Sequence, residues 1–278
     1  MSDHDDRATT DNPIRHAPLV IDLPNADLVR VRREIPYRED PEDRFAVFDL
    51  YAPSETADRP LPLVLVVSGY PDAGFERIVG CRLKDVRSYD AWGRLLAAAG
   101  CAVVIASNRD PVADLTALLH HLRDDADSLG LDLDRTAIWA CSGNVPNALA
   151  LLIDPPWPIR CAALLYGFLL DLADDPGGAT PVADAAAQFR FAMPAVGRTV
   201  DDLPATTALL IVRAGSDEMP GLNASIDTFL DAAGRLDRPV TTIDLPDAPH
   251  AFDLFHDHEA SRQAILRIVD FLRVQLDA

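Results

Sequence analysis

Residues 135–153 read RTAIWACSGNVPNALALLI, and they place a sharp turn between a strand and a helix. The β-branched and aromatic residues of RTAIWAC are typical of a strand that ends at Cys141, and VPNALALLI begins an apolar helix at Val145. The segment WACSGN between them therefore predicts a strand-to-helix turn, with Cys141 and Ser142 side by side in front of Gly143.

Strands and helices alternate on both sides of this turn. The run PLPLVLVVS at 60–68 is continuously apolar, which is typical of a parallel strand buried on both faces. Further strands are expected over 101–107, 160–168, 207–215 and 239–246, and helices over 88–100, 111–130, 145–153, 222–236 and 259–275. Two segments with partial alternation, 27–37 and 44–53, precede them as an antiparallel pair, and DSLGLDLDR at 127–135 is interpreted as a turn.

This order of elements predicts an α/β architecture: a mostly parallel central sheet with helices on both faces and an antiparallel N-terminal strand pair. Ligands bind such sheets beyond the carboxyl ends of the strands. Residues 1–18 are expected to form a disordered acidic tail, and 19–278 to form one domain. Within the domain, 171–206 is long for a crossover and is a candidate small lid.

The balance of charged residues indicates which kinds of partner the chain can bind. The chain has 25 Lys plus Arg against 44 Asp plus Glu, a formal net charge of −19, and Lys84 is its only lysine. Phosphate binding needs a basic face, so the balance argues against nucleic acid and anionic membrane as partners and favours solubility. No run approaches the ~18 apolar residues of a membrane span. Four cysteines without CxxC spacing fit reduced, buried thiols, and the expected location is the cytoplasm.

No cofactor and no metal are expected. Gly69 and Gly74 have the spacing of a P-loop, but Phe75 stands where the phosphate-binding lysine belongs. His256 and His258 lie near His250, but no clear second ligand cluster accompanies them, so solvated or helix-capping roles are favoured.

Either Ser142 or Cys141 could be the nucleophile at this turn. With Ser142 as nucleophile, Ala140 stands two residues earlier and is small enough to let the helix pass close to the strand. With Cys141 as nucleophile, Trp139 would stand there, and its indole is too large. The segment ACSGN thus matches the G-x-S-x-G nucleophile turn, with alanine and asparagine for the outer glycines. Asn144 is accepted at the last position because asparagine tolerates unusual backbone angles.

Partners for a nucleophile are expected at two other strand ends. Strand 207–215 runs into SDEMPGLN, which contains Asp217, and strand 239–246 is followed by DAPHAFD, which contains His250. Both loops meet the turn at one edge of the sheet, and the order serine, aspartate, histidine is that of α/β-hydrolases. With its RAGSDE and PHAF segments, the chain from about Phe45 onward resembles the α/β-hydrolase superfamily, especially its dienelactone-hydrolase-like and small serine esterase branches.

The resemblance implies a triad. Ser142 would attack an acyl carbonyl, His250 would accept and return its proton, and Asp217 would orient the imidazole. The backbone N–H groups of Gly143 and Tyr70 would hold the oxyanion, since Pro71 has no N–H.

One departure and two alternatives accompany this hypothesis. Ser68 stands where many relatives have histidine, so the geometry of the oxyanion loop is open. The expected substrate is a small-molecule ester or lactone with a short acyl chain, and a homodimer is compatible with the sequence. The alternatives are a catalytically silent binding protein of the same fold and a Cys141-dependent, dienelactone-hydrolase-like enzyme.

Overall fold

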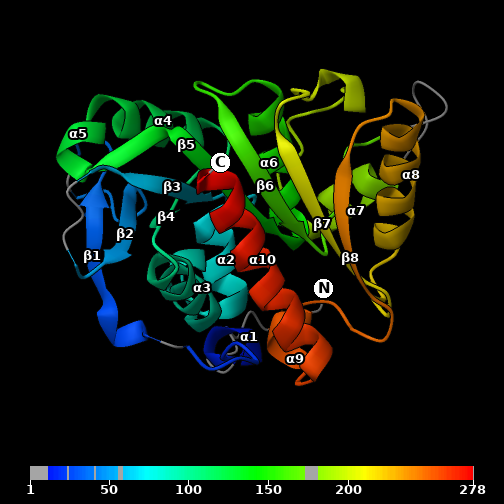
Figure 1. Cartoon of the computed structure of the whole chain (residues 1–278), viewed down its shortest axis with the longest axis horizontal. Coiled ribbons are helices and arrows are strands. Elements are labelled where there is room, and N and C mark those ends of the chain that lie inside the picture. Colours follow the sequence, from blue (N-terminus) through cyan, green and yellow to red (C-terminus); the bar gives the residue numbers. More distant parts are fainter. Residues whose placement is uncertain (1–11, 24, 41, 56–58, 173–180, 278) are drawn as a thin grey trace, which may run out of the picture.

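A computed structural model describes residues 12–277 except 24, 41, 56–58 and 173–180. Its centre is a sheet with the strand order β1-β2-β4-β3-β5-β6-β7-β8 (Figure 1). The strands are β1 Val29–Pro36, β2 Val47–Pro53, β3 Leu61–Val66, β4 Ala102–Ala106, β5 Leu131–Cys141, β6 Ile159–Leu165, β7 Ala208–Ala214 and β8 Val240–Leu245. Strand β2 is antiparallel to β1 and to β4, and the remaining pairs are parallel. The predicted mostly parallel sheet with an N-terminal antiparallel pair is confirmed.

Helices cover both faces of the sheet. They are α1 Pro13–His16, α2 Asp72–Val79, α3 Arg87–Ala98, α4 Ala113–Asp124, α5 Ala126–Leu129, α6 Val145–Ile153, α7 Pro181–Phe189, α8 Leu222–Arg235, α9 Phe252–Phe255 and α10 Glu259–Asp277. Single turns of 3₁₀-helix are η1 Ala26–Leu28, η2 Leu83–Asp85, η3 Ser142–Asn144 and η4 Val200–Asp202. Helices α3 and α10 contact the near face of the sheet in Figure 1, and α4, α6 and α8 pack on the opposite face.

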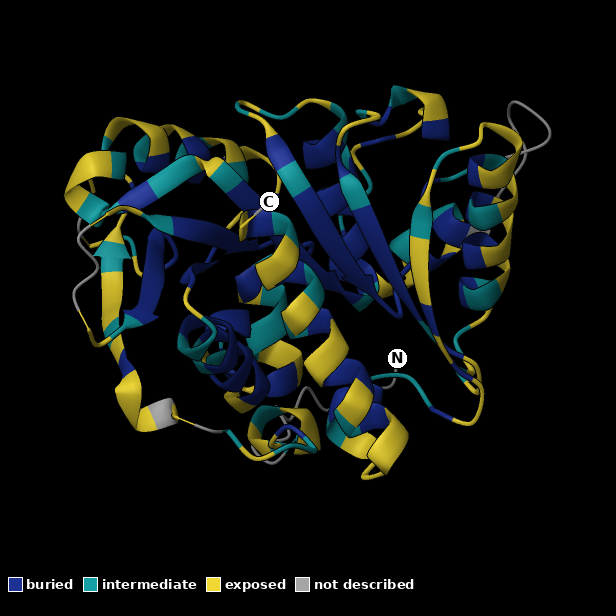
Figure 2. Ribbon diagram, in the orientation of Figure 1, coloured by how far each residue is buried: buried dark blue, intermediate teal, exposed yellow. Residues whose placement is uncertain are grey.

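Two apolar cores result from the alternation of side chains along the strands. Leu63 and Leu65 of β3 pack into the core under α4, α6 and α8, whereas Val64 and Val66 pack into the core under α3 and α10. The central strands are buried along most of their length (Figure 2). Each such side chain contributes roughly 1.5–3 kcal/mol on full burial, so the continuous apolar run of β3 stabilises both layers.

Strand order places two loops beside each other. Strand β3 pairs with β4 on one side and with β5 on the other, and Val66 at its end lies opposite Ile105 and Trp139. The chain therefore leaves β3 and β5 at neighbouring positions, where connections run to opposite sides of the sheet. This is the type of crevice in which open α/β sheets bind ligands.

Some segments differ from the sequence-based expectation. Residues 131–134, expected in a turn, belong to β5, because Leu131 is buried and pairs with Leu61 of β3. Helices α2, α7 and α9 were not predicted. Helix α1 lies inside the expected tail, and Asn12 before it donates to the Ile78 carbonyl at 3.2 Å. The candidate lid falls partly outside the described residues, at 173–180, and its described part contains α7 and η4.

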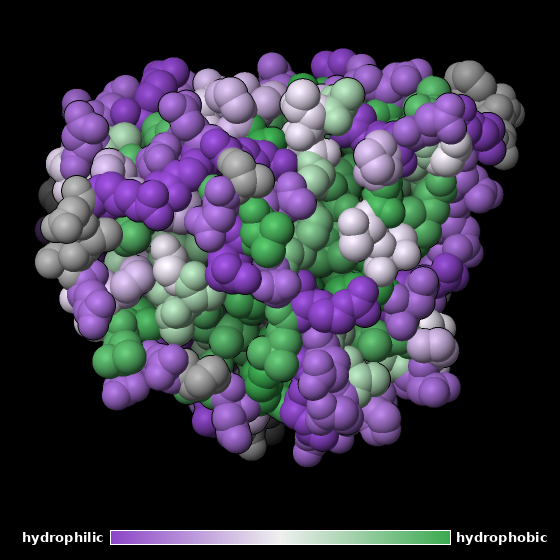
Figure 3. Space-filling view, in the orientation of Figure 1, coloured by the Kyte–Doolittle hydropathy of each residue, from purple (hydrophilic) through white to green (hydrophobic). Residues whose placement is uncertain are grey.

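The polar surface and the free cysteines agree with what the composition predicts. Polar side chains cover most of the face in Figure 3, with apolar side chains visible between them. All four cysteines are free and buried, as expected of reduced thiols. Among the described residues, no helix combines the length and apolar character that crossing a membrane requires.

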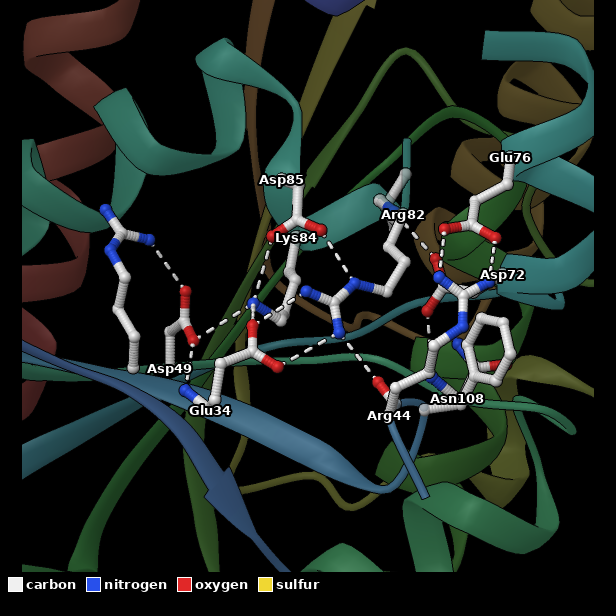
Figure 4. Close-up of polar contacts among 12 residues, drawn as sticks. Glu34, Arg44, Asp49, Asp72, Glu76, Arg82, Lys84, Asp85 and Asn108 are labelled. Atoms are coloured by element: carbon white, nitrogen blue, oxygen red, sulfur yellow. Dashed lines mark hydrogen bonds and ion pairs between the residues drawn. The ribbon is translucent and has the colours of Figure 1, made fainter. Parts of the chain in front are cut away.

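Lys84 is the buried centre of an ion cluster whose outer carboxylates are partly exposed (Figure 4). Its ammonium, 1% exposed, contacts the carboxylates of Glu34, Asp49 at 3.1 Å and Asp85 at 3.0 Å. Asp49 also accepts the backbone N–H of Glu34 at 2.9 Å, where β1 is irregular and Glu34 has a φ of 56°. Burial opposes the ammonium, but its carboxylate partners raise the pKa of Lys84 on balance. The cluster joins β1, β2 and η2 on the near side of the sheet.

Replacement of Lys84 by methionine should destabilise the fold by about 3–5 kcal/mol at pH 7, because three carboxylates lose their shared cation. Burial favours the neutral forms of Glu34 and Asp85, but hydrogen bonds from Arg82 and Lys84 lower both pKa values on balance. The stability they provide is thus present above their unfolded pKa and is lost as the pH falls.

Urea denaturation of Lys84→Met and wild type at pH 7 and pH 4 measures this. The difference in the free energy of unfolding between the variant and wild type should be smaller at pH 4, because protonation of the carboxylates relieves their repulsion in the variant. Arg273→Met, which breaks an exposed pair with Asp270, is the control and should leave the midpoint unchanged. A Lys84→Met variant as stable as wild type at pH 7 would contradict the role given to the cluster.

Candidate active site

Ser142 occupies a strained turn between β5 and α6. Its φ is 56°, in the left-handed region that non-glycine residues rarely adopt, and its side chain is partly exposed. The turn is tightly enclosed by glycines. A Cβ on Gly69 would lie 2.4 Å from the Gly143 carbonyl oxygen, and a Cβ on Gly167 would lie 2.7 Å from the Ser142 carbonyl oxygen. The backbone of the neighbouring loops can approach Ser142 only because these positions have no side chain.

The structure brings Ser142, His250 and Asp217 together. Ser142 Oγ lies 2.8 Å from His250 Nε2, and His250 Nδ1 lies 2.6 Å from Asp217 Oδ2. The Asp217 side chain has no exposed surface, and its other oxygen accepts the Met219 N–H at 2.9 Å. The three residues follow β5, β8 and β7, so the strand ends predicted from the sequence meet at one edge of the sheet. The spacing allows a proton to pass from the hydroxyl to the imidazole.

The ring of a buried tyrosine, Tyr166, packs against the imidazole of His250. The Tyr166 ring packs edge-on against His250 with ring centroids 5.0 Å apart, and its hydroxyl donates to Asp253 Oδ1 at 2.7 Å. Trp92 Nε1 donates to Asp253 Oδ2 at 2.9 Å. Burial raises the pKa of Asp253, although these donors lower it in part. No sequence pattern indicates Tyr166 or Trp92, and Asp253 is distinguished only by its position between His250 and His256.

Cys141, the alternative nucleophile, faces the core under α3 and α10. Its sulfur lies 3.3 Å from the Tyr89 hydroxyl and 3.9 Å from Asn144 Nδ2. Burial raises the pKa of the Cys141 thiol to about 12. A reactive cysteine needs a thiolate near neutral pH, so this environment favours an inert thiol.

Asn144 has a different role from the one expected. Its φ is −84°, so the backbone needs neither glycine nor a residue tolerant of unusual angles, and that reason for accepting asparagine was wrong. Instead, Asn144 Oδ1 accepts the Gly69 N–H at 2.7 Å, and Nδ2 donates to the Tyr89 hydroxyl at 2.9 Å. Asn147 of α6 adds a second tether, since its Nδ2 donates to the Ser68 carbonyl at 2.7 Å. Both asparagines hold the loop after β3 against the nucleophile turn.

The loop after β3 contains the other residues predicted for the oxyanion site. The backbone N–H of Tyr70, the predicted donor, points to Ser68 Oγ at 3.4 Å. The Tyr70 hydroxyl instead lies beside the Ser142 side chain and the Gly143 backbone. Ser68 Oγ also accepts from Asn108 Nδ2 at 3.3 Å, so the serine that replaces the usual histidine organises the loop locally.

Aromatic rings form a wall next to the turn. Phe191 is buried and stacks on Phe168 with ring centroids 5.5 Å apart, and it meets Tyr70 edge-on at 6.1 Å. A Cβ on Gly143 would lie 2.7 Å from Phe191 Cδ1, so this ring borders the space in front of the nucleophile. The Ala192 N–H donates to the Gly69 carbonyl at 2.8 Å and fixes the wall to the loop after β3.

The histidines considered as metal ligands have other contacts. His256 Nδ1 lies 2.8 Å from Ser261 Oγ, and His258 Nδ1 accepts the Ala260 N–H at 3.3 Å near the start of α10. In the part of the chain that the structure describes, no group of three or more His, Cys, Asp or Glu residues is arranged to hold a metal ion.

The fold is that of α/β-hydrolases. Similar solved structures include a truncated carbohydrate esterase from gut microbiota, with a TM-score of 0.65 and 13% identity over 90% of this chain and 97% of that one. Esterase B from Lactobacillus rhamnosis has a TM-score of 0.61 and 17% identity over 91% and 88% of the two chains. A fungal esterase from Rhizomucor miehei has a TM-score of 0.64 and 17% identity over 91% of this chain and 87% of that one.

These similarities establish the α/β-hydrolase fold of the chain; they do not distinguish its dienelactone-hydrolase-like branch. No protein-family model and no curated protein matches the chain.

Asn144→Gly restores the glycine of the motif, and we nevertheless expect it to lower kcat by roughly ten- to a hundredfold. Without the side-chain amide, the Gly69 N–H loses its acceptor and the loop can shift, and displacements of about 1 Å can cost a hundredfold. Turnover of p-nitrophenyl butyrate measures the effect. Asn25→Gly, which removes an asparagine side chain that makes no capping bond at η1, is the control and should keep wild-type turnover. Unchanged or faster turnover of Asn144→Gly would show that the tether is dispensable.

Proposed function

We propose that this protein is a serine hydrolase that cleaves a short-chain carboxylic ester or lactone through an acyl-enzyme. The observation that carries the proposal is the unbroken chain of contacts from Ser142 Oγ through His250 to the buried carboxylate of Asp217. The esterases among the structural neighbours support the same class of reaction.

The geometry supports a two-step reaction. Ser142 Oγ attacks the acyl carbon, its proton moves to His250 Nε2, and the carbonyl π electrons move to the oxygen. The tetrahedral intermediate then expels the alkoxide, which takes the proton from His250. Water repeats the sequence in place of the serine, so that the acid is released and Ser142 regains its proton. Asp217 stabilises the imidazolium in both steps through its contact with Nδ1.

Two observations favour this proposal over its alternatives. His250 Nε2 contacts Ser142, while the Cys141 sulfur contacts Tyr89 in the core, which disfavours a cysteine nucleophile. A strained φ such as that of Ser142 costs about 1–3 kcal/mol, and a protein that only binds a ligand has no need to hold a hydroxyl in this way. Strain at an active site is part of the mechanism when it presents the nucleophile to the substrate.

An organophosphate should label Ser142, and Ser142→Ala should lower kcat on p-nitrophenyl butyrate by roughly 10⁴- to 10⁶-fold while the protein stays folded. Mass spectrometry of the intact protein and mapping of the adduct to one residue identify the nucleophile. Cys141→Ala is the matched control at the neighbouring position and should keep both labelling and turnover. An adduct on Cys141, or full activity of Ser142→Ala, would contradict a serine nucleophile.

The aromatic wall should limit the length of the acyl chain. Each methylene buried in a matching groove contributes about 0.8 kcal/mol, so an enzyme with a long acyl tunnel gains kcat/KM steadily as the chain lengthens. With Phe191 and Phe168 stacked beside the turn, we expect kcat/KM to rise to about four carbons and then to fall.

Measurement of kcat/KM for p-nitrophenyl acetate, butyrate, octanoate and palmitate tests this limit. Phe191→Ala should flatten the decline, because it opens the wall. Phe189→Ala, at a more exposed position of the same segment, is the control and should keep the wild-type profile. A maximum at octanoate or beyond in the wild type would rule out the short-acyl proposal.

A further inference from the structure

The loop after β3 has few backbone donors left for an oxyanion. The N–H groups of residues 69, 70 and 72 are engaged, and residue 71 is a proline without one. Their acceptors are Asn144 Oδ1 at 2.7 Å for Gly69, Ser68 Oγ at 3.4 Å for Tyr70 and the Asn108 carbonyl at 3.2 Å for Asp72. A second donor beside Gly143 must therefore come from a group other than these N–H groups.

The Tyr70 side chain occupies the required place. Its hydroxyl lies beside the Ser142 side chain and the Gly143 backbone, and it would lie 2.2 Å from a Cβ on Gly143. The ring is held between Phe75 and Phe191, each with its centroid 6.1 Å away. The hydroxyl is thus fixed next to both the nucleophile and the first donor.

We propose that the phenolic hydroxyl of Tyr70, together with the backbone N–H of Gly143, holds the oxyanion, so that Tyr70 is a catalytic residue through its side chain. In the resting protein the Tyr70 hydroxyl lies next to the Gly143 backbone. The carbonyl oxygen of a bound ester accepts from both groups. As Ser142 Oγ bonds to the acyl carbon, negative charge develops on this oxygen, and both donors stabilise it. This inference rests on the proposed serine hydrolase.

The chemistry of the hydroxyl suits this role. Burial raises the pKa of Tyr70 to about 12, although its contacts with Ser142 and Gly143 lower it in part. The group therefore keeps its proton, and so remains a donor, throughout the range in which the imidazole acts as a base. A hydroxyl that merely filled the space would compete with the substrate, and its removal would raise activity. The two roles thus predict changes of opposite sign.

Tyr70→Phe removes the oxygen and keeps the ring. We expect kcat on p-nitrophenyl butyrate to fall by about 10²- to 10³-fold with little change in KM, as for the loss of one oxyanion donor. Tyr51→Phe is the matched control, because its hydroxyl contacts Asp90 in a different part of the molecule, and it should keep wild-type kcat. Thermal melting verifies that both variants are folded.

A transition-state analogue separates donation from general disturbance of the site. A trifluoromethyl ketone with a butyl chain forms a hemiketal with the serine and carries the oxyanion. Its inhibition constant should rise by a similar factor in Tyr70→Phe, whereas that of butyrate, which forms no adduct, should stay within about threefold.

The outcomes distinguish this inference from the proposed function. Wild-type or faster turnover of Tyr70→Phe, with Ser142 still labelled by the organophosphate, overturns the role of Tyr70 and leaves the serine hydrolase intact. An equal rise in both inhibition constants also overturns it, because the hydroxyl would then only shape the pocket. Absence of a Ser142 adduct in the wild type, with full activity of Ser142→Ala, overturns the proposed function itself.

Discussion

The left-handed conformation of Ser142 is the constraint on which the site depends. A strand that ends and a helix that begins within three residues force the serine into a positive φ, and this lifts its side chain away from the sheet. The turn can be packed only by backbone without side chains, which Gly69 and Gly167 supply. The strain of about 1–3 kcal/mol is small against the burial of two apolar cores, so the fold can hold it permanently.

The strand order brings three further loops to the strained turn at Ser142. Because β3 lies between β4 and β5, the loop after β3 stands directly beside the turn after β5, and Asn144 and Asn147 bind the two together. The loops after β7 and β8 supply Asp217 and His250 at the same edge. Next to them, the Tyr166 ring packs against the imidazole, and its hydroxyl donates to Asp253; both residues are buried. Each contact limits the freedom of a reacting group before any substrate binds.

Sequence reasoning predicted the strands and most helices from local patterns, and it placed Ser142, Asp217 and His250 at strand ends that the structure brings together. It missed Tyr166 and Trp92, whose bonds to Asp253 join positions 87 and 161 residues apart and follow no motif. It also missed the strand at 131–134, since alternating aspartates suggest a turn until pairing with β3 is known. Asn144 was accepted for its backbone tolerance, whereas its side-chain amide is what the structure uses.

Asn144, which departs from the glycine motif, and Ser68, which stands in place of the usual histidine, both act on the loop after β3. A glycine at position 144 would leave the Gly69 N–H without its acceptor, whereas asparagine engages this N–H and so fixes the loop. The same bond engages a backbone donor that the proposed oxyanion site would otherwise have, and Ser68 engages another. A tyrosine at position 70 compensates in the proposed mechanism, because its hydroxyl lies next to the Gly143 backbone and comes from the loop that Asn144 holds in place. The rigid loop and the need for a side-chain donor then both follow from asparagine in place of glycine at position 144. The effects of variants at positions 144 and 70 are therefore not expected to be additive.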